Sequence, residues 1–228
     1  MNNMSKDKPI NNTNETVREK PMTKPNEQSG LLLQGHIKIH DPTTGEVFIN
    51  KRNAIHYENF SLALAQSISD VGQGLIEGMA FGNGGTSVDP TGVITYLPTN
   101  TSGSNSSLYN QTFYKVVDGN SAFNLDPTRN NIQIRHTTGT VYSDIFITCT
   151  LDYGEPSGQQ AFDNTTNFND SFVFDELGLK VSNGSGTTNT GNLITHVVFH
   201  PIQKSLNRLI QVDYTVRVQT LTSLSSQV

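Results

Sequence analysis

Short runs of alternating apolar and polar residues, separated by turns, constrain the fold of this chain more than any other feature. In residues 33–39 every second residue is apolar or glycine and the others are polar, the period of a half-buried strand. Residues 41–45, Asp-Pro-Thr-Thr-Gly, are turn formers, and residues 46–50 resume a strand pattern. The sequence therefore predicts a hairpin over residues 33–50.

The same type of pattern continues to the end of the chain. Turn-rich segments at 118–130, 154–170 and 183–192 separate the runs. Strands at this spacing predict an all-β chain with a β-sandwich or jelly-roll-like domain. The further strands are expected at residues 74–81, 93–97, 112–117, 131–136, 141–153, 171–182, 193–201 and 208–221.

One segment has a helical period instead. Phe60, Leu64 and Ile68 recur at helical spacing within residues 57–69, which predicts one helix with a face packed on the sheet. Glycines at positions 72 and 74 are expected to end it. The composition agrees with a β-rich chain: hydrophobic residues make up only 34% and charged residues 15%. Asn, Ser and Thr are abundant, and these residues favour turns and exposed strand faces over helices.

The first 30 residues differ from the rest. They contain almost no apolar side chains, three prolines and mixed charge, so alone they cannot bury enough surface to offset their ordering entropy. Two alternatives follow: a disordered tail, or an extended polar arm that lies along neighbouring subunits. We divide the chain into an N-terminal arm, residues 1–30, and a single β-sandwich-like domain, residues 31–228.

Charge and targeting signals narrow the possible functions. The net charge is −5, the pI is about 5.6 and no basic stripe is present, so we expect no nucleic-acid recognition. Residues 1–9 are polar without a following apolar segment, and no apolar run is long enough to span a bilayer. We therefore expect synthesis in the cytoplasm and no membrane association. Cys149, the one cysteine, lies in an alternating run and is expected to be a small buried filler rather than a reactive thiol.

The glycine-rich stretch 82–87, Gly-Asn-Gly-Gly-Thr-Ser, superficially resembles a phosphate-binding loop. Such a loop needs a lysine and a following helix, and neither is present. We expect these glycines to serve positive φ angles in an ordinary loop.

Histidine and acidic residues offer two possible metal sites. His196 and His200 share a face of an expected strand but lie about 13 Å apart along it, so we expect surface or interface histidines rather than a metal site. A third ligand would have to come from His36, His40, His56 or His136. An oxygen-rich cluster that could hold Ca²⁺ lacks the EF-hand spacing, so a solvated loop is expected there. It consists of Asp163, Asn167, Asn169 and Asp170.

No group of residues points to catalysis. A glycoside hydrolase needs two carboxylates across a cleft, and the chain has several acids but no tryptophan for sugar stacking. The acids considered were Asp144, Asp152, Glu155, Asp175 and Glu176. No Ser/His/Asp or Cys/His signature is present either. We expect a non-enzymatic protein with no catalytic, cofactor-binding or metal-binding residues and no cofactor.

Residues 74–218 resemble structural proteins of tailed-bacteriophage virions. Residues 79–86, Met-Ala-Phe-Gly-Asn-Gly-Gly-Thr, are similar to a loop of that group with the pattern x-Phe-Gly-x-Gly-Thr. Residues 171–179 end a strand on an acidic pair and Leu-Gly-Leu, and a Gly/Asn/Thr loop follows. Residues 193–204 contain Phe-x-Pro-x-x-Lys, and residues 208–218 contain Tyr-Thr-x-x-Val.

The resemblance implies a non-catalytic part of a virion. The expected place is a neck or collar ring at the head–tail junction; the alternatives are a capsid decoration protein and a fibre-associated module that binds a receptor or glycan. It also implies partners: copies of the same chain in a homo-oligomer, and other virion structural proteins such as portal or connector, capsid or tail proteins. Polar arms that fold on binding, open strand edges and heterologous ring contacts suit such an assembly.

Overall fold

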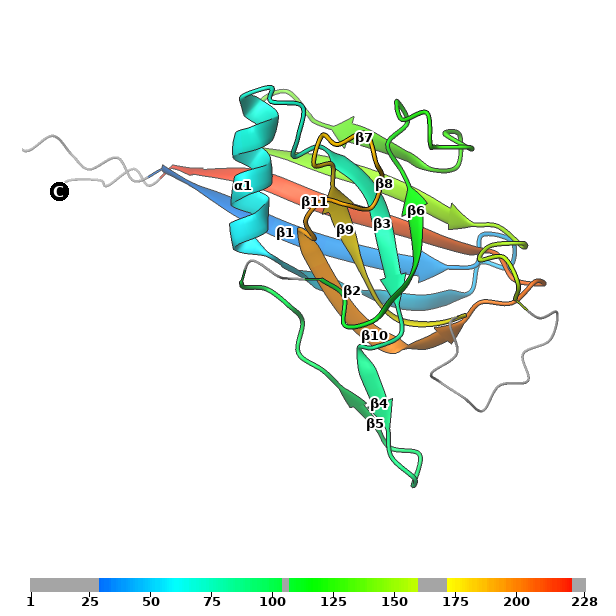
Figure 1. Ribbon diagram of the computed structural model, residues 1–228. Coiled ribbons are helices and arrows are strands. Elements are labelled where there is room, and N and C mark those ends of the chain that lie inside the picture. The colour runs from blue at the N-terminus through cyan, green and yellow to red at the C-terminus, as the bar shows by residue number, and fades with distance from the viewer. Residues whose placement is uncertain (1–28, 104–106, 160–171, 223–228) are drawn as a thin grey trace, which may run out of the picture. The chain divides into compact units, whose positions relative to one another are not determined.

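Nine strands of the described part of the chain form one antiparallel sheet, in the order β6-β3-β9-β10-β2-β1-β11-β8-β7 (Figure 1). The computed structural model describes residues 29–103, 107–159 and 172–222. Gly30–Leu221 form one compact unit. The strands of the large sheet are β1 (Ser29–His40), β2 (Val47–Ile55), β3 (Ile76–Gly82), β6 (Gln111–Val116), β7 (Asn131–Arg135), β8 (Tyr142–Leu151), β9 (Val173–Val181), β10 (Thr195–Gln203) and β11 (Ile210–Thr222).

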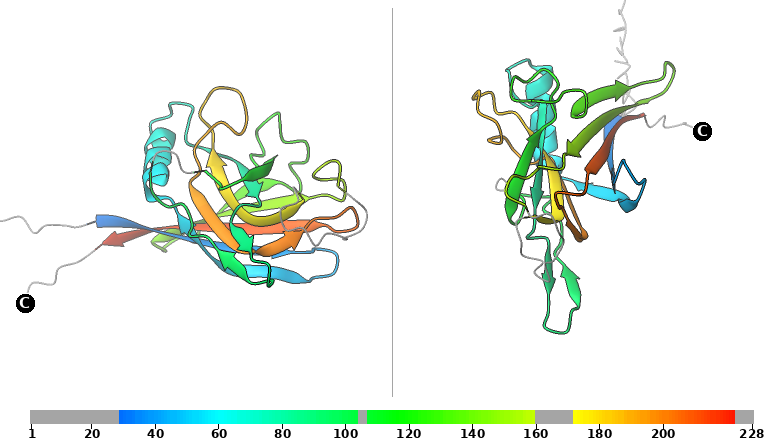
Figure 2. Two further views of the ribbon diagram at one scale, coloured as in Figure 1. Left: turned by 60° about the horizontal axis from the view of Figure 1, so that its bottom comes forward. Right: turned by 90° about the vertical axis from the view of Figure 1, so that its right-hand side faces the viewer.

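The sheet curls into a half-barrel whose two halves face each other like the layers of a sandwich (Figure 2). β6, β3, β9 and β10 form one half, and β2, β1, β11, β8 and β7 form the other. The halves are joined by a short ladder between β10 and β2, in which Thr195 pairs with Ile55 and His196 with Ala54. Curling brings the apolar faces of both halves onto a common core. That core includes Ile37, Ile39, Met79, Phe81, Ile147, Cys149, Leu177, Leu179, Val197, Phe199, Val212, Tyr214 and Val216.

The predicted first hairpin is confirmed by the pairing of β1 with β2. Its turn is held by Asp41, whose carboxylate accepts hydrogen bonds from the backbone N–H groups of Thr43 and Thr44. Gly45, with φ of +77°, then allows the chain to reverse. The turn chemistry visible in the sequence is therefore what sets this connection.

The predicted helix is also confirmed, as α1 (Tyr57–Ile68). His56 caps its N-terminus, because its Nδ1 accepts the backbone N–H of Asn59. The expected buried face is wrong at one position: Phe60 and Ala63 enter the core, whereas Ile68 is 76% exposed. The buried side chains of α1, those of Asn59, Phe60 and Ala63, all lie in its first two turns.

The all-β, sandwich-like domain with one helix predicted from the sequence is confirmed. A second small sheet is formed by β4 (Thr86–Val88) and β5 (Ile94–Tyr96). The strand expected at residues 93–97 is confirmed as β5, whereas β4 begins within residues 82–87, where a loop is expected from the sequence. The N-terminal arm, residues 1–30, lies outside the described residues apart from its last two. Within the described part of the chain, no helix is long and apolar enough to cross a membrane.

Candidate functional site

Two adjacent carboxylates, those of Asp175 and Glu176, are buried in the middle of β9. Adjacent residues of a strand point to opposite sides, so both sides of β9 must supply partners at this point. A buried charge without partners costs several kcal/mol or more, which makes the partners decisive. They come from the loop between β3 and β4, from the start of β4, from the segment just before β6 and from His196 of β10.

Glu176 accepts four hydrogen bonds. Its Oε1 receives the backbone N–H groups of Gly84 at 3.2 Å and Asn110 at 2.8 Å, and its Oε2 receives the N–H of Tyr109 at 2.9 Å and Nε2 of His196 at 3.0 Å. Burial by itself raises the pKa of this carboxyl. The hydrogen bonds from His196 and the two amides outweigh that effect and lower the pKa below its usual value. Glu176 therefore stays ionised although it is fully buried.

Asp175 holds the start of β4. Its Oδ1 accepts the N–H of Gly85 at 2.9 Å, and its Oδ2 accepts both the N–H and the hydroxyl of Thr86, at 2.8 and 2.5 Å. Burial raises the pKa of Asp175 above its ordinary value, and the three hydrogen bonds only partly offset this. The two neighbouring carboxylates thus have pKa values shifted in opposite directions.

His196 links the cluster to the loop after β5. The backbone N–H of Asn100 donates to its Nδ1 at 2.8 Å, so the ring proton must be on Nε2, which donates to Glu176. His196 is fully buried, so the expectation of a surface or interface histidine is wrong for this residue. His200 is exposed as expected, with Nδ1 3.3 Å from the hydroxyl of Tyr96. An irregular register of β10 against β9, between Val198 and Ile202, breaks the simple alternation on which the expectation rested.

The glycines of residues 82–85 serve close approach rather than positive φ, which corrects the sequence prediction. None of Gly82, Gly84 and Gly85 has a positive φ angle. A Cβ at Gly82 would lie 2.5 Å from both the carbonyl oxygen of Asn110 and Oε1 of Glu176, and a Cβ at Gly84 would lie 2.7 Å from Cβ of Tyr109. Glycine is needed because the loop backbone lies directly on the carboxylates. The amides that a phosphate loop would offer to an anion are here bound to the chain's own acids.

The hydrogen bonds to Asp175 hold the base of a hairpin that projects from the body of the domain. β4 and β5 pair antiparallel, with Thr86 opposite Tyr96 and Val88 opposite Ile94 (Figures 1 and 2). Their base is fixed by Asp175 and by the N–H of Leu97, which donates to the carbonyl of Gly85 at 2.8 Å. Directly opposite residues share a face, so Val88, Ile94 and Tyr96 form one apolar face. Tyr96 is 50% exposed there.

The other acids considered in the sequence are paired with basic residues. Asp144 accepts a two-pronged interaction from Arg217 at 2.7 and 2.8 Å, and the pKa of Asp144 is lowered by it. Asp152 pairs with Arg129 at 2.8 Å, and Glu155 pairs with the ammonium group of Lys115. The oxygen-rich cluster at residues 163–170 lies outside the described residues. Among the residues that are described, no group of three His, Cys, Asp or Glu side chains could hold a metal ion.

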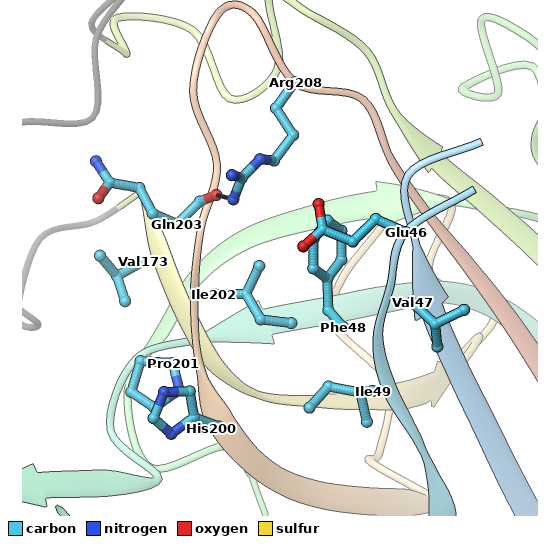
Figure 3. A pocket seen from close by; sticks show the side chains of 10 residues that line it. All are labelled: Glu46, Val47, Phe48, Ile49, Val173, His200, Pro201, Ile202, Gln203 and Arg208. Atoms are coloured by element: carbon cyan, nitrogen blue, oxygen red, sulfur yellow. Dashed lines mark hydrogen bonds between the residues drawn. The ribbon is translucent and has the colours of Figure 1, made fainter. Parts of the chain in front are cut away.

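A shallow groove of about 490 Å³ opens where β2 and β10 separate beyond their short ladder (Figure 3). Phe48 and Ile202 line it, and Glu46, Gln203 and Arg208 bring polar groups to it. The guanidinium of Arg208 donates to the carbonyl of Gln203 at 3.1 Å and lies 5.3 Å from the ring centre of Phe48. The groove can offer hydrogen bonds and one aromatic surface to a polar ligand.

Two further buried groups have clear structural roles. Cys149 is fully buried, as predicted, and burial raises the pKa of its thiol to about 12. Lys204 is 1% exposed, and its ammonium group donates to the carbonyls of Ser205 and Tyr153 and to Oε1 of Gln159. Burial lowers its pKa to about 8, although Glu155 and Asp152 act in the opposite direction.

The buried cluster of Asp175, Glu176 and His196 holds the surrounding segments through hydrogen bonds, and we call this cluster the clamp. Every carboxylate oxygen of Asp175 and Glu176 accepts at least one hydrogen bond from a backbone amide of residues 84–86 or 109–110, so the pair ties these segments to β9. From the sequence, the pair is interpreted as possible catalytic acids and as part of the 171–179 motif of the resemblance, and neither interpretation predicts that it binds the neighbouring loops. The signal for their actual role was the position of two acids inside a run that is otherwise apolar, residues 172–179. Comparisons with protein-family models, with curated proteins and with solved structures found no match.

Proposed function

We propose that this chain is a non-enzymatic structural component of a tailed-phage virion, which assembles as an oligomer at the head–tail junction as part of a neck or collar. The virion assignment rests on the resemblance of residues 74–218 to that group. The observation that carries the assembly role is the β4–β5 hairpin: it projects from the body, exposes apolar side chains, and is held by a fully buried acidic clamp.

The physical argument is one of rigidity. Binding elements that are fixed before association lose less conformational entropy on docking. A hairpin of two three-residue strands is marginal alone. Asp175 and Glu176 bind its base and the adjoining loop through backbone amides, which supplies the stability that the hairpin lacks. Such an arrangement suits a contact element between subunits.

The test is the mass of the purified protein and its presence in particles. Analytical ultracentrifugation at micromolar concentration should give one assembly of several subunits, and antibodies against the protein should label purified virions at the head–tail junction. Labelling over the capsid surface would favour the decoration alternative. A protein that stays monomeric and is absent from particles would refute the proposal.

A second candidate is a fibre-associated module that binds a receptor or glycan. The groove between β2 and β10 supports it, because Glu46, Gln203 and Arg208 surround an aromatic side chain there. Binding on a glycan array that is lost in Arg208→Ala would favour this candidate. The same array with Arg129→Ala, a change at a surface ion pair elsewhere, is the matched control.

A further inference from the structure

An apolar groove of about 480 Å³ lies at the open side of the curled sheet, between α1 and the edge strand β7. Its floor belongs to the hydrophobic core, with Phe60, Ala63 and Ile194 buried there. Its rim is exposed: Ile134 is 66% and Leu75 is 56% accessible to solvent. The groove is thus a part of the core that the described residues leave uncovered.

The groove is bordered by β7, an edge strand of the large sheet. β7 ends the strand order of the large sheet, so within the described part of the chain no strand pairs with its outer side. Natural edge strands normally carry charges or bulges that discourage pairing with another chain. β7 carries one charged residue, Arg135 at its end, whose guanidinium lies 3.5 Å from the ring centre of Phe146. Ile132 and Ile134 line the groove, and Asp118 is the one charged side chain in the lining. An open edge beside an apolar groove is suited to accept another β element.

The β4–β5 hairpin has the matching chemistry. Its apolar side chains are exposed: Val88 is 37%, Val93 58% and Tyr96 50% accessible. Asp89 is the single charged residue between positions 86 and 97. In Figure 1 and in the right-hand view of Figure 2, the β4–β5 hairpin extends from the end of the domain that lies away from α1 and β7, the elements that border the groove. The hairpin of one copy therefore does not fill the groove of the same copy.

We propose that the β4–β5 hairpin of one copy docks in the groove between α1 and β7 of the next copy. The inference rests on the proposed function in one respect, that the chain assembles with itself. Both surfaces belong to the same chain and lie at different places on it, so the contact is heterologous and propagates head to tail, which closes into a ring when the rotation permits. A second copy is the occupant because it supplies a projecting apolar element that the polar residues 1–28 do not.

The direct test is a disulfide between copies. Val88→Cys on the apolar face of the hairpin and Ile134→Cys on the groove rim place one accessible thiol on each surface, and both positions are exposed enough to leave the core intact. The native Cys149 should form no disulfide in this experiment, because it is fully buried and its thiol pKa is raised. Mixing the two single variants under mild oxidation should give a covalent dimer on a non-reducing gel.

Leu206→Cys is the matched control for the groove variant, because it is an exposed apolar residue of the turn between β10 and β11. Mixed with Val88→Cys, it should give much less covalent dimer than Ile134→Cys does. Equal yields from both mixtures would overturn the proposal, because they would indicate that the disulfides form by random collision and not in a specific contact.

A second measurement tests the energetics. Val88→Asp on the hairpin and Ile134→Asp in the groove should each weaken assembly at least tenfold, which is the order expected for placing a charge in an apolar contact. The double variant should be no weaker than the stronger single effect, because both residues belong to one contact. Raising the salt concentration should not dissolve the wild-type assembly, because neither surface relies on charge pairs.

The outcomes separate the two proposals. If the wild-type protein assembles but Ile134→Asp assembles normally and the cysteine pair does not react, the hairpin-in-groove contact is wrong and the proposed function stands. If the wild-type protein is monomeric at every concentration and absent from particles, both are wrong. Circular dichroism of each variant confirms that a change in mass is not a loss of fold.

Discussion

Replacing Glu176 by Gln tests the clamp at its centre. A glutamine has nearly the same shape, but it has one carbonyl oxygen where the carboxylate has two acceptor oxygens. Each oxygen of Glu176 accepts two hydrogen bonds, so two of the four donors would face the amide NH₂. His196 cannot relieve this by moving its proton to Nδ1, because Nδ1 already accepts the N–H of Asn100.

The expected cost follows from these two lost bonds. A hydrogen bond to a charged group contributes about 1.5–3 kcal/mol, so the variant should lose about 4 kcal/mol of the free energy of unfolding. This is a large share of the roughly 5–15 kcal/mol that a domain has in total. Asp175→Asn should cost less, about 2 kcal/mol, because its amide oxygen can keep two of the three bonds from Gly85 and Thr86.

Urea unfolding followed by circular dichroism measures both values, with the exposed Glu46→Gln as control.

Because the pKa of Glu176 is lowered in the folded protein, its stabilising effect is present above the unfolded pKa of about 4.3 and is lost as the pH falls through the folded pKa. The difference between Glu176→Gln and wild type should therefore shrink in acid. A loss below about 1 kcal/mol at pH 7 would refute the clamp, since that is the size of a single ordinary hydrogen bond.

Three further results are expected. Gly178→Ala should cost about 3 kcal/mol in urea unfolding, because its Cβ would lie 2.1 Å from the carbonyl oxygen of Thr195, whereas Gly119→Ala, which has open space, should be neutral. The thiol of Cys149 should react with a thiol reagent only after denaturation; fast reaction in the native state would contradict its burial. Lys204 has a folded pKa of about 8 against 10.5 when unfolded, so stability should rise between those pH values by up to about 3 kcal/mol, and this rise should be missing in Lys204→Met.

The strands and the helix could be predicted because their signals are local. Alternation and turn residues determine where β1, β2 and most later strands lie, and Asp41 and Gly45 mark the first turn. β4 was missed because Thr86 and Ser87 are polar and follow glycines. Its structure depends on Asp175, which lies 89 residues further along the chain. A pattern read along the sequence cannot contain such a contact.

The candidate site was harder to predict for the same reason. The burial of His196 comes from a loop that folds over it, and the role of Gly82 and Gly84 comes from an approach to Glu176. Sequence reasoning identified the acidic pair and the glycine stretch separately, with the wrong reason for the glycines. Only the fold shows that the two bind each other.

The native mass of the 228-residue chain tests the central claim most directly. The chain has a mass of 25.0 kDa. If it assembles through its hairpin, analytical ultracentrifugation will show a single species of several times that mass, and Val88→Asp will return it to the mass of one chain. A wild-type protein that remains at the mass of one chain, at every concentration measured, would contradict the account.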